Sequence, residues 1–366
     1  MKFKIHQSNL MEALNAVQGV VGSRVTLPVL SNVLVEASGE NLTFTTTDFT
    51  VAKRFSCKAE IAENGAVTLP VKRLTSIVRE LSDQIVEIAS ADGGEAAVRM
   101  QCGSYKSRIV GIAASDFPKI PATTDGQSYT MPQAALKEML RKTAYAAAAD
   151  DASRPVLTGT LLSFADGKAT CVSTDGRRLA LVWSEVEFPP ENAKDVVLAP
   201  RTVAELSRSL GDEGDVRVTV KDTQIVFEFG QMYFSSKLLN GTYPNYKQVV
   251  ITDCEHKMRA NREELLAVLR RINVSTTPTT NAMRLTFADN LLTIAVNAPD
   301  VEEATDTVTV KYDGPPITAI FNPEYMMEPL KNLTSDEVVI EINNPSSPGL
   351  VKDDTSFLYV LMPLRV

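Results

Sequence analysis

The sequence contains few of the residues on which most catalytic and metal sites depend. It has two histidines, His6 and His256, and neither lies in a recognisable motif. We therefore expect both at the surface, with His256 in a polar linker. None of the four cysteines is spaced as a CxxC pair or a zinc knuckle. They are expected to be free thiols in a reducing compartment: Cys57, Cys102, Cys171 and Cys254.

Motifs of nucleotide-binding and hydrolytic enzymes are also absent. The chain has no GxxxxGK[ST], GxGxxG or GxSxG. The carboxylate pairs Asp150-Asp151, Glu263-Glu264 and Asp353-Asp354 are adjacent in sequence, and adjacent side chains of a helix or strand do not converge on one site. We expect them in solvated turns or at helix starts. The sequence thus predicts no catalytic site, no metal and no cofactor.

Long apolar runs are missing as well. No run approaches the ~20 residues needed to span a bilayer, and the opening MKFKIHQSNL lacks the apolar core of a signal peptide. We therefore expect a cytoplasmic protein. The hydrophobic fraction of 44% is sufficient for ordinary packed cores.

The most informative feature that the sequence does contain is a repeat that occurs three times. An apolar strand, a proline near a helix start, an apolar stripe and a polar stop recur as VTLPVKRLTSIVRELSD at 67–83, VVLAPRTVAELSRSLGD at 196–212 and AIFNPEYMMEPLKNLTSD at 319–336. Each third also opens with a short strand and an amphipathic helix. These patterns predict six helices, at 8–17, 72–82, 132–146, 201–210, 262–272 and 323–333.

The repeat predicts three domains of the α+β class, at 1–120, 128–250 and 255–366. Alternating strands separate the helices, which indicates helices segregated to one side of antiparallel sheets.

Charge is distributed unevenly between the predicted helices and the rest of the chain. The six stretches hold 12 Lys and Arg against 8 Asp and Glu, a net charge of +4, so the remainder carries −12 in a chain of net −8. A basic helical face and an acidic sheet face would explain the difference. A helix of ~15 Å could lie across the ~12 Å major groove of DNA and touch phosphates on both sides without reading bases. The alternative is that Lys and Arg simply solvate exposed helices.

One dense polar cluster stands out, Thr174-Asp175-Gly176-Arg177-Arg178-Leu179. Asp-Gly predicts a tight turn between two strands. The two arginines after it could bind a carboxylate or a phosphate. The alternative is an ordinary hairpin with a solvated basic end.

Several segments resemble the bacterial replicative sliding clamp family, the beta subunit of DNA polymerase III. They run in register from Met1 to Val366 and are TLPVLSN at 26–32, SDFP at 115–118, TDGRRLA at 174–180, SKLLNGTYPNY at 236–246, FNPEY at 321–325 and YVLMPLRV at 359–366. The resemblance implies a head-to-tail homodimer that closes into a six-domain ring, with helices lining the hole and antiparallel sheets outside. The implied partners are encircled double-stranded DNA, the polymerase III alpha subunit, the clamp loader, and other polymerases and repair proteins. No membrane partner is implied.

The resemblance also implies a pocket between domains two and three that binds short partner peptides. The matching positions are Leu157, Thr174, Gly176, Arg177, Arg178, Leu179, Pro244, Val249, Asn322, Tyr325, Val360, Met362, Pro363, Leu364 and Arg365. Leu, Val, Met and Pro suit an adaptable apolar groove. For Leu157, Leu179 and Val360, simple core packing is the alternative. TDGRRL and MPLRV have no equivalent in the other thirds of the sequence.

DNA contact and dimerisation are implied at further positions. The DNA-binding candidates are Arg24, by resemblance, and by helix position Lys72, Arg73, Arg79, Arg141, Lys142 and Arg201. The dimer-interface candidates are Ser107, Ile109, Arg271 and Val274. Some positions depart from the family pattern: Asp151 replaces a DNA-contacting glutamine, and Pro155 and Val156 replace the aromatic pair that follows it. Gln248 replaces a pocket arginine, and Ser107 replaces an aromatic residue at the dimer edge. Asp151 rules out its loop as a phosphate site, because a carboxylate repels phosphate.

Two other functions remain open at the level of sequence. An α+β DNA-processing enzyme would need a metal or nucleophile motif, which the chain lacks, and a nuclease assay with Mg²⁺ and Mn²⁺ would test it. A scaffold that uses only the peptide groove would show no coupling to DNA when a loader and ATP are supplied.

Overall fold

The computed structural model describes residues 1–22, 27–91, 96–120, 126–251, 254–276, 281–298 and 302–364. The described residues form two compact units. The first comprises 1–134 with 204–238, and the second comprises 135–203 with 239–366. The middle repeat contributes to both units, so each unit contains one junction between consecutive repeats.

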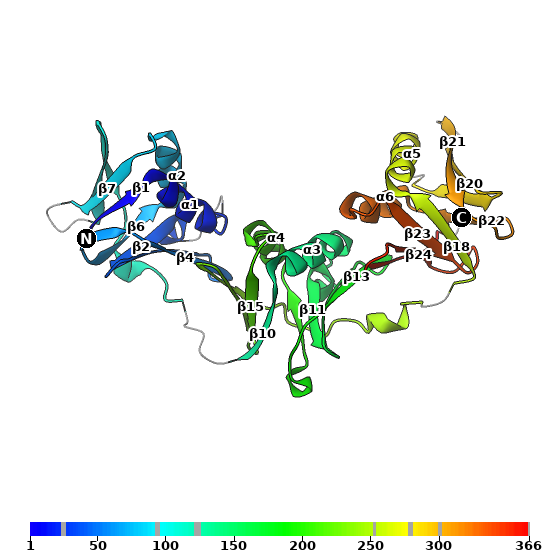
Figure 1. Cartoon of the computed structure of the whole chain (residues 1–366), viewed down its shortest axis with the longest axis horizontal. Helices are drawn as coiled ribbons and strands as arrows, with labels where there is room; N and C mark the ends of the chain where they lie inside the picture. Colours follow the sequence, from blue (N-terminus) through cyan, green and yellow to red (C-terminus); the bar gives the residue numbers. More distant parts are fainter. Residues whose placement is uncertain are drawn as a thin grey trace. The chain divides into compact units, whose positions relative to one another are not determined.

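All six predicted helices are present, and each end lies within three residues of its predicted position. They are α1 (Gln7–Gln18), α2 (Val71–Glu80), α3 (Gln133–Thr143), α4 (Pro200–Ser209), α5 (Arg262–Val274) and α6 (Pro323–Asn332). In the first repeat α1 packs against α2, and in the third α5 packs against α6 (Figure 1). Each helix follows the apolar spacing of its sequence. Leu10, Leu14 and Val17, for example, are buried on one side of α1.

The first unit contains two antiparallel sheets. The smaller sheet has the order β5 (Glu60–Glu63), β1 (Lys2–His6), β7 (Ile85–Ser90), β8 (Ala97–Cys102) and β9 (Tyr105–Val110). The larger sheet has the order β10 (Gln127–Pro132), β15 (Asp215–Val220), β16 (Gln224–Phe229), β17 (Met232–Lys237), β4 (Val51–Lys58), β3 (Asn41–Thr47), β2 (Asn32–Ser38) and β6 (Gly65–Pro70). Strands of the first and middle repeats meet where β17 pairs with β4.

The second unit contains one continuous antiparallel sheet of twelve strands. Its first half is β14 (Lys194–Leu198), β11 (Thr160–Ala165), β12 (Lys168–Thr174), β13 (Arg178–Glu185), β25 (Leu358–Leu361) and β24 (Gly349–Lys352). Its second half is β23 (Glu337–Ile342), β18 (His256–Asn261), β21 (Glu302–Lys311), β20 (Leu291–Ala298), β19 (Met283–Ala288) and β22 (Ile317–Phe321). The prediction of a linker for His256 is wrong, because this residue begins β18 and its Nδ1 lies 2.8 Å from the Tyr312 hydroxyl.

The junctions between repeats are built alike in the two units. In the first, β4 pairs with β17, the last strand of the middle repeat. In the second, β13 pairs with β25, the last strand of the third repeat. The backbone N–H of Lys237 donates to Thr50 O at 2.9 Å in the first junction, and that of Met362 donates to Arg177 O at 2.9 Å in the second. Thr50 and Arg177 follow the same turn in their respective repeats, so one seam geometry is used twice.

The turn before each seam strand is also repeated. Asp48 Oδ1 accepts from the backbone N–H groups of Thr50 and Val51 at 2.9 and 2.8 Å. Asp175 Oδ1 accepts from those of Arg177 and Arg178 at 2.9 and 3.0 Å. The statement that TDGRRL has no equivalent in the other thirds is therefore wrong at the level of backbone, since Thr47–Ala52 forms the same turn. Thr47 and Asp48 match Thr174 and Asp175, and the side chains that follow this pair are what differ.

Candidate functional site

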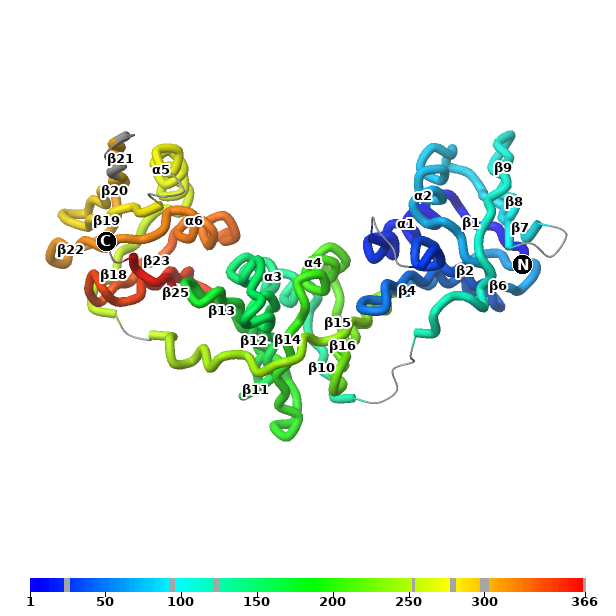
Figure 2. Tube along the Cα trace, turned by 180° about the vertical axis from the view of Figure 1, so that it is seen from behind, coloured from blue at the N-terminus to red at the C-terminus, as the bar shows by residue number. Residues whose placement is uncertain are grey.

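A pocket opens beside the seam between β13 and β25, in the second unit. It encloses about 160 Å³ of water-accessible space. Its walls come from the loop before β11, the turn between β12 and β13, strand β25, and the segment 239–251, which we call the connector. Figure 2 shows the connector passing across the strands of the middle repeat. The lining residues are Arg154, Leu157, Thr174, Gly176, Arg177, Arg178, Leu179, Pro244, Asn245, Tyr246, Val249, Val360 and Met362.

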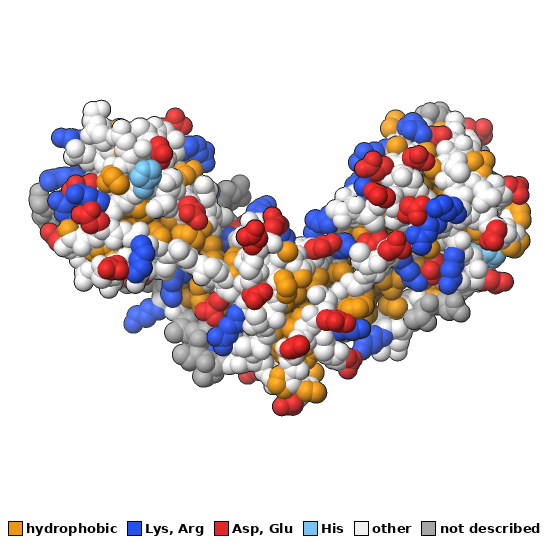
Figure 3. All heavy atoms as spheres, in the orientation of Figure 1, with side chains coloured by type: hydrophobic (Ala, Val, Ile, Leu, Met, Phe, Trp, Pro, Cys, Tyr) orange, Lys and Arg blue, Asp and Glu red, His pale blue; other side chains and the backbone are white. Residues whose placement is uncertain are grey.

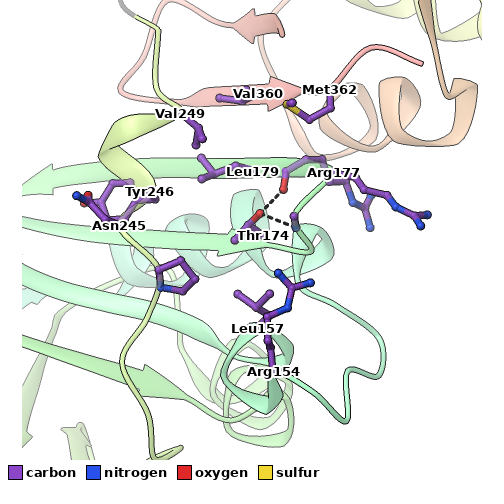
Figure 4. A pocket seen from close by; sticks show the side chains of 13 residues that line it. Arg154, Leu157, Thr174, Arg177, Leu179, Asn245, Tyr246, Val249, Val360 and Met362 are labelled. Carbon is purple, nitrogen blue, oxygen red and sulfur yellow. Dashed lines mark hydrogen bonds between the residues drawn. The ribbon is translucent and has the colours of Figure 1, made fainter. Parts of the chain in front are cut away.

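The floor of the pocket is apolar and belongs to the core of the sheet. Leu157, Leu179 and Val360 are almost fully buried, while Val249 and Met362 on the rim are 45% and 42% exposed. The side chains of these five residues surround the opening (Figure 4). For the three buried residues, core packing and pocket lining are therefore both true. Exposed Val and Met beside a buried apolar floor leave apolar surface that an incoming side chain can cover.

The turn at 174–178 fixes the polar wall of the pocket. Thr174 Oγ1 donates to Arg178 O at 2.6 Å and accepts from the Gly176 N–H at 3.0 Å (Figure 4). Gly176 has φ +86°, a conformation that favours glycine. A Cβ at this position would lie 3.7 Å from both terminal nitrogens of Arg154, so the guanidinium of Arg154 covers this glycine.

Arg178 is held in place from several sides. Its Nε donates to Asp175 Oδ2 at 3.1 Å and its terminal nitrogen donates to Tyr145 O at 2.7 Å. The guanidinium also lies over the Tyr325 ring, 4.3 Å from its centroid. Burial raises the pKa of the neighbouring Tyr359 hydroxyl, which donates to Tyr325 O at 2.8 Å. The Arg178 side chain is 12% exposed and lines the pocket, and a fixed guanidinium there is suited to a carbonyl or carboxylate oxygen.

Four of the predicted pocket residues that the structure describes lie outside the pocket lining. Asn322 caps α6, because its Oδ1 accepts from the Tyr325 N–H at 3.2 Å. Tyr325 lines an adjoining hollow beneath Arg178. The Leu364 N–H donates to Ile320 O at 2.8 Å, and Leu364 and Pro363 continue the chain away from the pocket lining. Arg365 lies outside the described residues.

Three pocket residues were missed by the sequence reasoning: Arg154, Asn245 and Tyr246. Asn245 and Tyr246 directly follow the Tyr243-Pro244 pair, and the connector brings them onto the sheet. The Tyr243 hydroxyl accepts from the Thr174 N–H at 3.1 Å, and burial raises the pKa of that hydroxyl. A segment with two tyrosines between two domains is the signal that could have identified Asn245 and Tyr246.

Most predicted DNA-contacting cations are exposed on helices. Lys72, Arg73 and Arg79 are exposed on α2, Arg141 on α3 and Arg201 on α4. On the face seen in Figure 3, acidic and basic side chains are interspersed over α5 and α6. Arg24 lies outside the described residues.

The prediction that Lys142 contacts DNA is wrong. Its side chain is 3% exposed, and Nζ lies 3.3 Å from Asp353 Oδ2 and 3.0 Å from Glu138 Oε1. A buried ammonium with two carboxylate partners cannot reach a phosphate. The prediction that Asp353 lies in a solvated turn is wrong for the same reason, since its side chain is 1% exposed.

The predicted dimer-edge residues divide into two groups. Ile109 is 4% exposed and packs in the core of its own repeat, so its assignment as an interface side chain is wrong. Ser107 shares that face of β9, and its buried hydroxyl has no hydrogen-bond partner among the described residues. Val110 is 61% exposed, on the opposite face of the strand. On α5, Val274 is 83% exposed, and Arg271 pairs with Asp306 at 2.7 Å.

No group of three or more His, Cys, Asp and Glu side chains is placed to hold a metal ion within the ranges described. Among the same residues, no helix is both long and apolar enough to cross a membrane. None of the four cysteines forms a disulfide among the described residues.

Comparisons with known proteins agree along the whole chain. Family models of the DNA polymerase III beta subunit match residues 1–121 (N-terminal domain), 130–245 (central domain) and 247–365 (C-terminal domain). The chain is 32% identical to a beta sliding clamp of Chlamydia trachomatis, over all of this chain and 87% of that protein. It is 30% identical to the beta sliding clamp of Vibrio cholerae, over the full length of both. A crystal structure of a Pseudomonas aeruginosa sliding clamp bound to griselimycin superimposes with a TM-score of 0.95 at 29% identity and full coverage of both chains.

Proposed function

The chain belongs to the DNA polymerase III beta subunit family, the bacterial DNA sliding clamps, and from this premise we propose that two copies close head to tail into a ring around double-stranded DNA. The ring holds the polymerase alpha subunit, the clamp loader and other replication and repair proteins by their short peptides. It works as a tether and catalyses no reaction.

The repeated seam supports the ring. β4, β13 and β21 occupy the same place in the three repeats, as do β9, β17 and β25. Two seams are made within the chain, β4 with β17 and β13 with β25. The remaining strands are β21 and β9, and β9 pairs only with β8 among the described strands. A third seam of the same kind needs β21 of one copy and β9 of another, and this arrangement is head to tail.

The two open edges have opposite charge. On β9, Lys106 and Arg108 are exposed. On β21, Glu303 is exposed, and β18 pairs with this strand only at Val310 and Lys311. Opposite charges on facing edges favour one pairing and one orientation. Each edge also has unpaired backbone groups, which a second copy would satisfy.

The partner site that the geometry supports is the pocket at the seam of β13 and β25. The observation that carries this assignment is a buried apolar floor beside pre-set hydrogen-bond donors, which suits a short peptide with apolar anchors and a polar residue. Arg154, Asn245 and Tyr246 join the predicted set. Four predicted residues lie beside the pocket and outside its lining: Asn322, Tyr325, Pro363 and Leu364.

Retention on DNA of different topology tests the ring. After loading with a clamp loader and ATP, the protein should remain on circular DNA at high salt and leave when the circle is cut, because the link is topological. Ordinary phosphate contacts would instead weaken with salt on both forms alike. Equal retention on circular and linear DNA would contradict the proposal. Sedimentation should give the mass of two chains.

A further inference from the structure

A second hollow lies on the other side of the connector, on the same face of the sheet. It is formed by β11, β12 and β13 together with the connector, and encloses about 420 Å³. Its lining residues are Ser163, Ala165, Asp166, Lys168, Thr170, Leu181, Trp183, Tyr246, Lys247 and Val250. None of them was predicted as a site residue.

The strand register shows that the hollow and the peptide pocket share one sheet face. Thr170 pairs with Trp183, and two residues along, Val172 pairs with Leu181. Two residues further, Thr174 pairs with Leu179 at the peptide pocket. Because side chains at every second residue point to the same face, one continuous surface runs from Trp183 to Leu179.

The connector crosses this surface and divides it. Tyr246 lines both hollows. Tyr246 and Val250 pack against the buried cluster that includes Leu179 and Val360. The two hollows are thus separated by the short helical turn Tyr246–Gln248, and a chain seated in one needs only to pass over this turn to reach the other.

The second hollow combines apolar and cationic side chains. Leu181, Trp183 and Val250 are only partly buried. Lys168 Nζ lies 3.8 Å from the centroid of the Trp183 ring, and Lys247 is exposed at the rim. Two lysines and one aspartate line the hollow, so its lining carries one net positive charge, and Asp195 acts on Tyr246 from beside it. This chemistry suits a segment with a large apolar side chain next to a carboxylate.

We infer that this second hollow is an accessory site for the same partner polypeptide, and that it takes an acidic and apolar segment next to the peptide in the main pocket. The inference rests on the proposed function, because the main pocket supplies the first anchor. Linking two weak contacts raises the overall affinity without requiring either to be strong. Partners would then differ in affinity through residues outside their short motif.

The chain's single tryptophan provides a direct readout, since Trp183 lies in the hollow. Two kinds of synthetic tryptophan-free peptide would be compared: a short one with a glutamine and two apolar anchors, and longer ones extended by about six residues, ~20 Å when extended. The extension alternates Glu and Leu, and is placed at the amino end in one peptide and at the carboxyl end in another. We expect one extended peptide to bind about tenfold more tightly than the short one. Only that peptide should change the Trp183 emission.

Variants separate the accessory site from the main pocket. Lys247→Glu should remove the gain from the extension and leave the short peptide unaffected. Lys237→Glu, the same change at an exposed lysine of β17, should alter neither. Met362→Ala should weaken both peptides. If neither extension tightens binding, or if Lys247→Glu leaves the gain intact, the accessory site is wrong while the main pocket stands. If the short peptide does not bind at all, the proposed function fails and this inference fails with it.

Discussion

Single residues decide how the pocket differs from its counterpart in the first repeat. The turn at 47–52 has the same hydrogen bonds from threonine and aspartate side chains to the backbone as that at 174–179. Gly176 is replaced there by Phe49, which has φ +71° and is half exposed. Leu179 corresponds to Ala52, and its strand partner Val360 corresponds to Ser235. The apolar floor is thus specific to the second seam.

Gly176→Ala should damage the pocket through the backbone. A left-handed conformation costs a residue with a side chain about 1–2 kcal/mol. The added methyl group would also touch the Arg154 guanidinium. We expect the free energy of unfolding, measured with denaturant, to fall by this amount. We also expect a partner peptide to bind more weakly.

Gly167→Ala is the matched control. Gly167 has φ +69° and nothing within 4 Å of the added carbon. It should lose similar stability but bind peptide normally. Equal peptide affinity in the two variants would show that Gly176 matters only for folding.

Lys142→Ala should be strongly destabilising, although a surface cation would tolerate this change. Removing one partner of a buried ion pair leaves the other charge unpaired and costs about 3–5 kcal/mol. The neighbouring Arg141→Ala, whose side chain is 39% exposed, should cost less than about 1 kcal/mol. Equal unfolding free energies for the two variants would contradict the buried position of Lys142.

Secondary-structure elements were the most predictable level of this chain. Apolar spacing, prolines at helix starts and polar stops located all six α-helices of the residues that the structure describes. The face of a strand was harder to predict: Ile109 and Val110 are neighbouring apolar residues, and only the pleat decides which one is buried. Burial of Lys142 could not be predicted either, because Asp353 is more than two hundred residues away in sequence.

Strand β9 gives a prediction at the scale of an element. Arg108→Glu places a negative charge on an edge that would face the acidic edge of β21. We expect dimerisation to weaken by about tenfold, or 1.4 kcal/mol, as measured by sedimentation equilibrium.

Arg79→Glu carries the same charge change on the exposed face of α2. It should leave dimerisation intact and reduce retention on DNA. If Arg108→Glu dimerised as well as the unaltered chain, β9 would not form the third seam.

For the molecule as a whole, the threefold repeat and the family resemblance predicted the architecture and the location of the main pocket. Leu179 and Val360, for example, were predicted from motifs far apart in sequence and meet across one strand pair. The contribution of Arg154 and Tyr246 could not be predicted, because it depends on how the loop before β11 and the connector lie on the sheet. Local sequence does not specify such long-range packing.

The seam between β13 and β25 has a mechanical consequence. A peptide bound in the main pocket, as proposed, would touch Leu179 on one side of the seam and Val360 on the other, so it would bind only while the two strands remain paired. By linkage, a partner at a concentration of one hundred times its Kd would add about 2.7 kcal/mol to the free energy needed to separate the two strands. Binding of a partner peptide would therefore stabilise the pairing of β13 with β25, and this pairing should be most stable when a partner is bound.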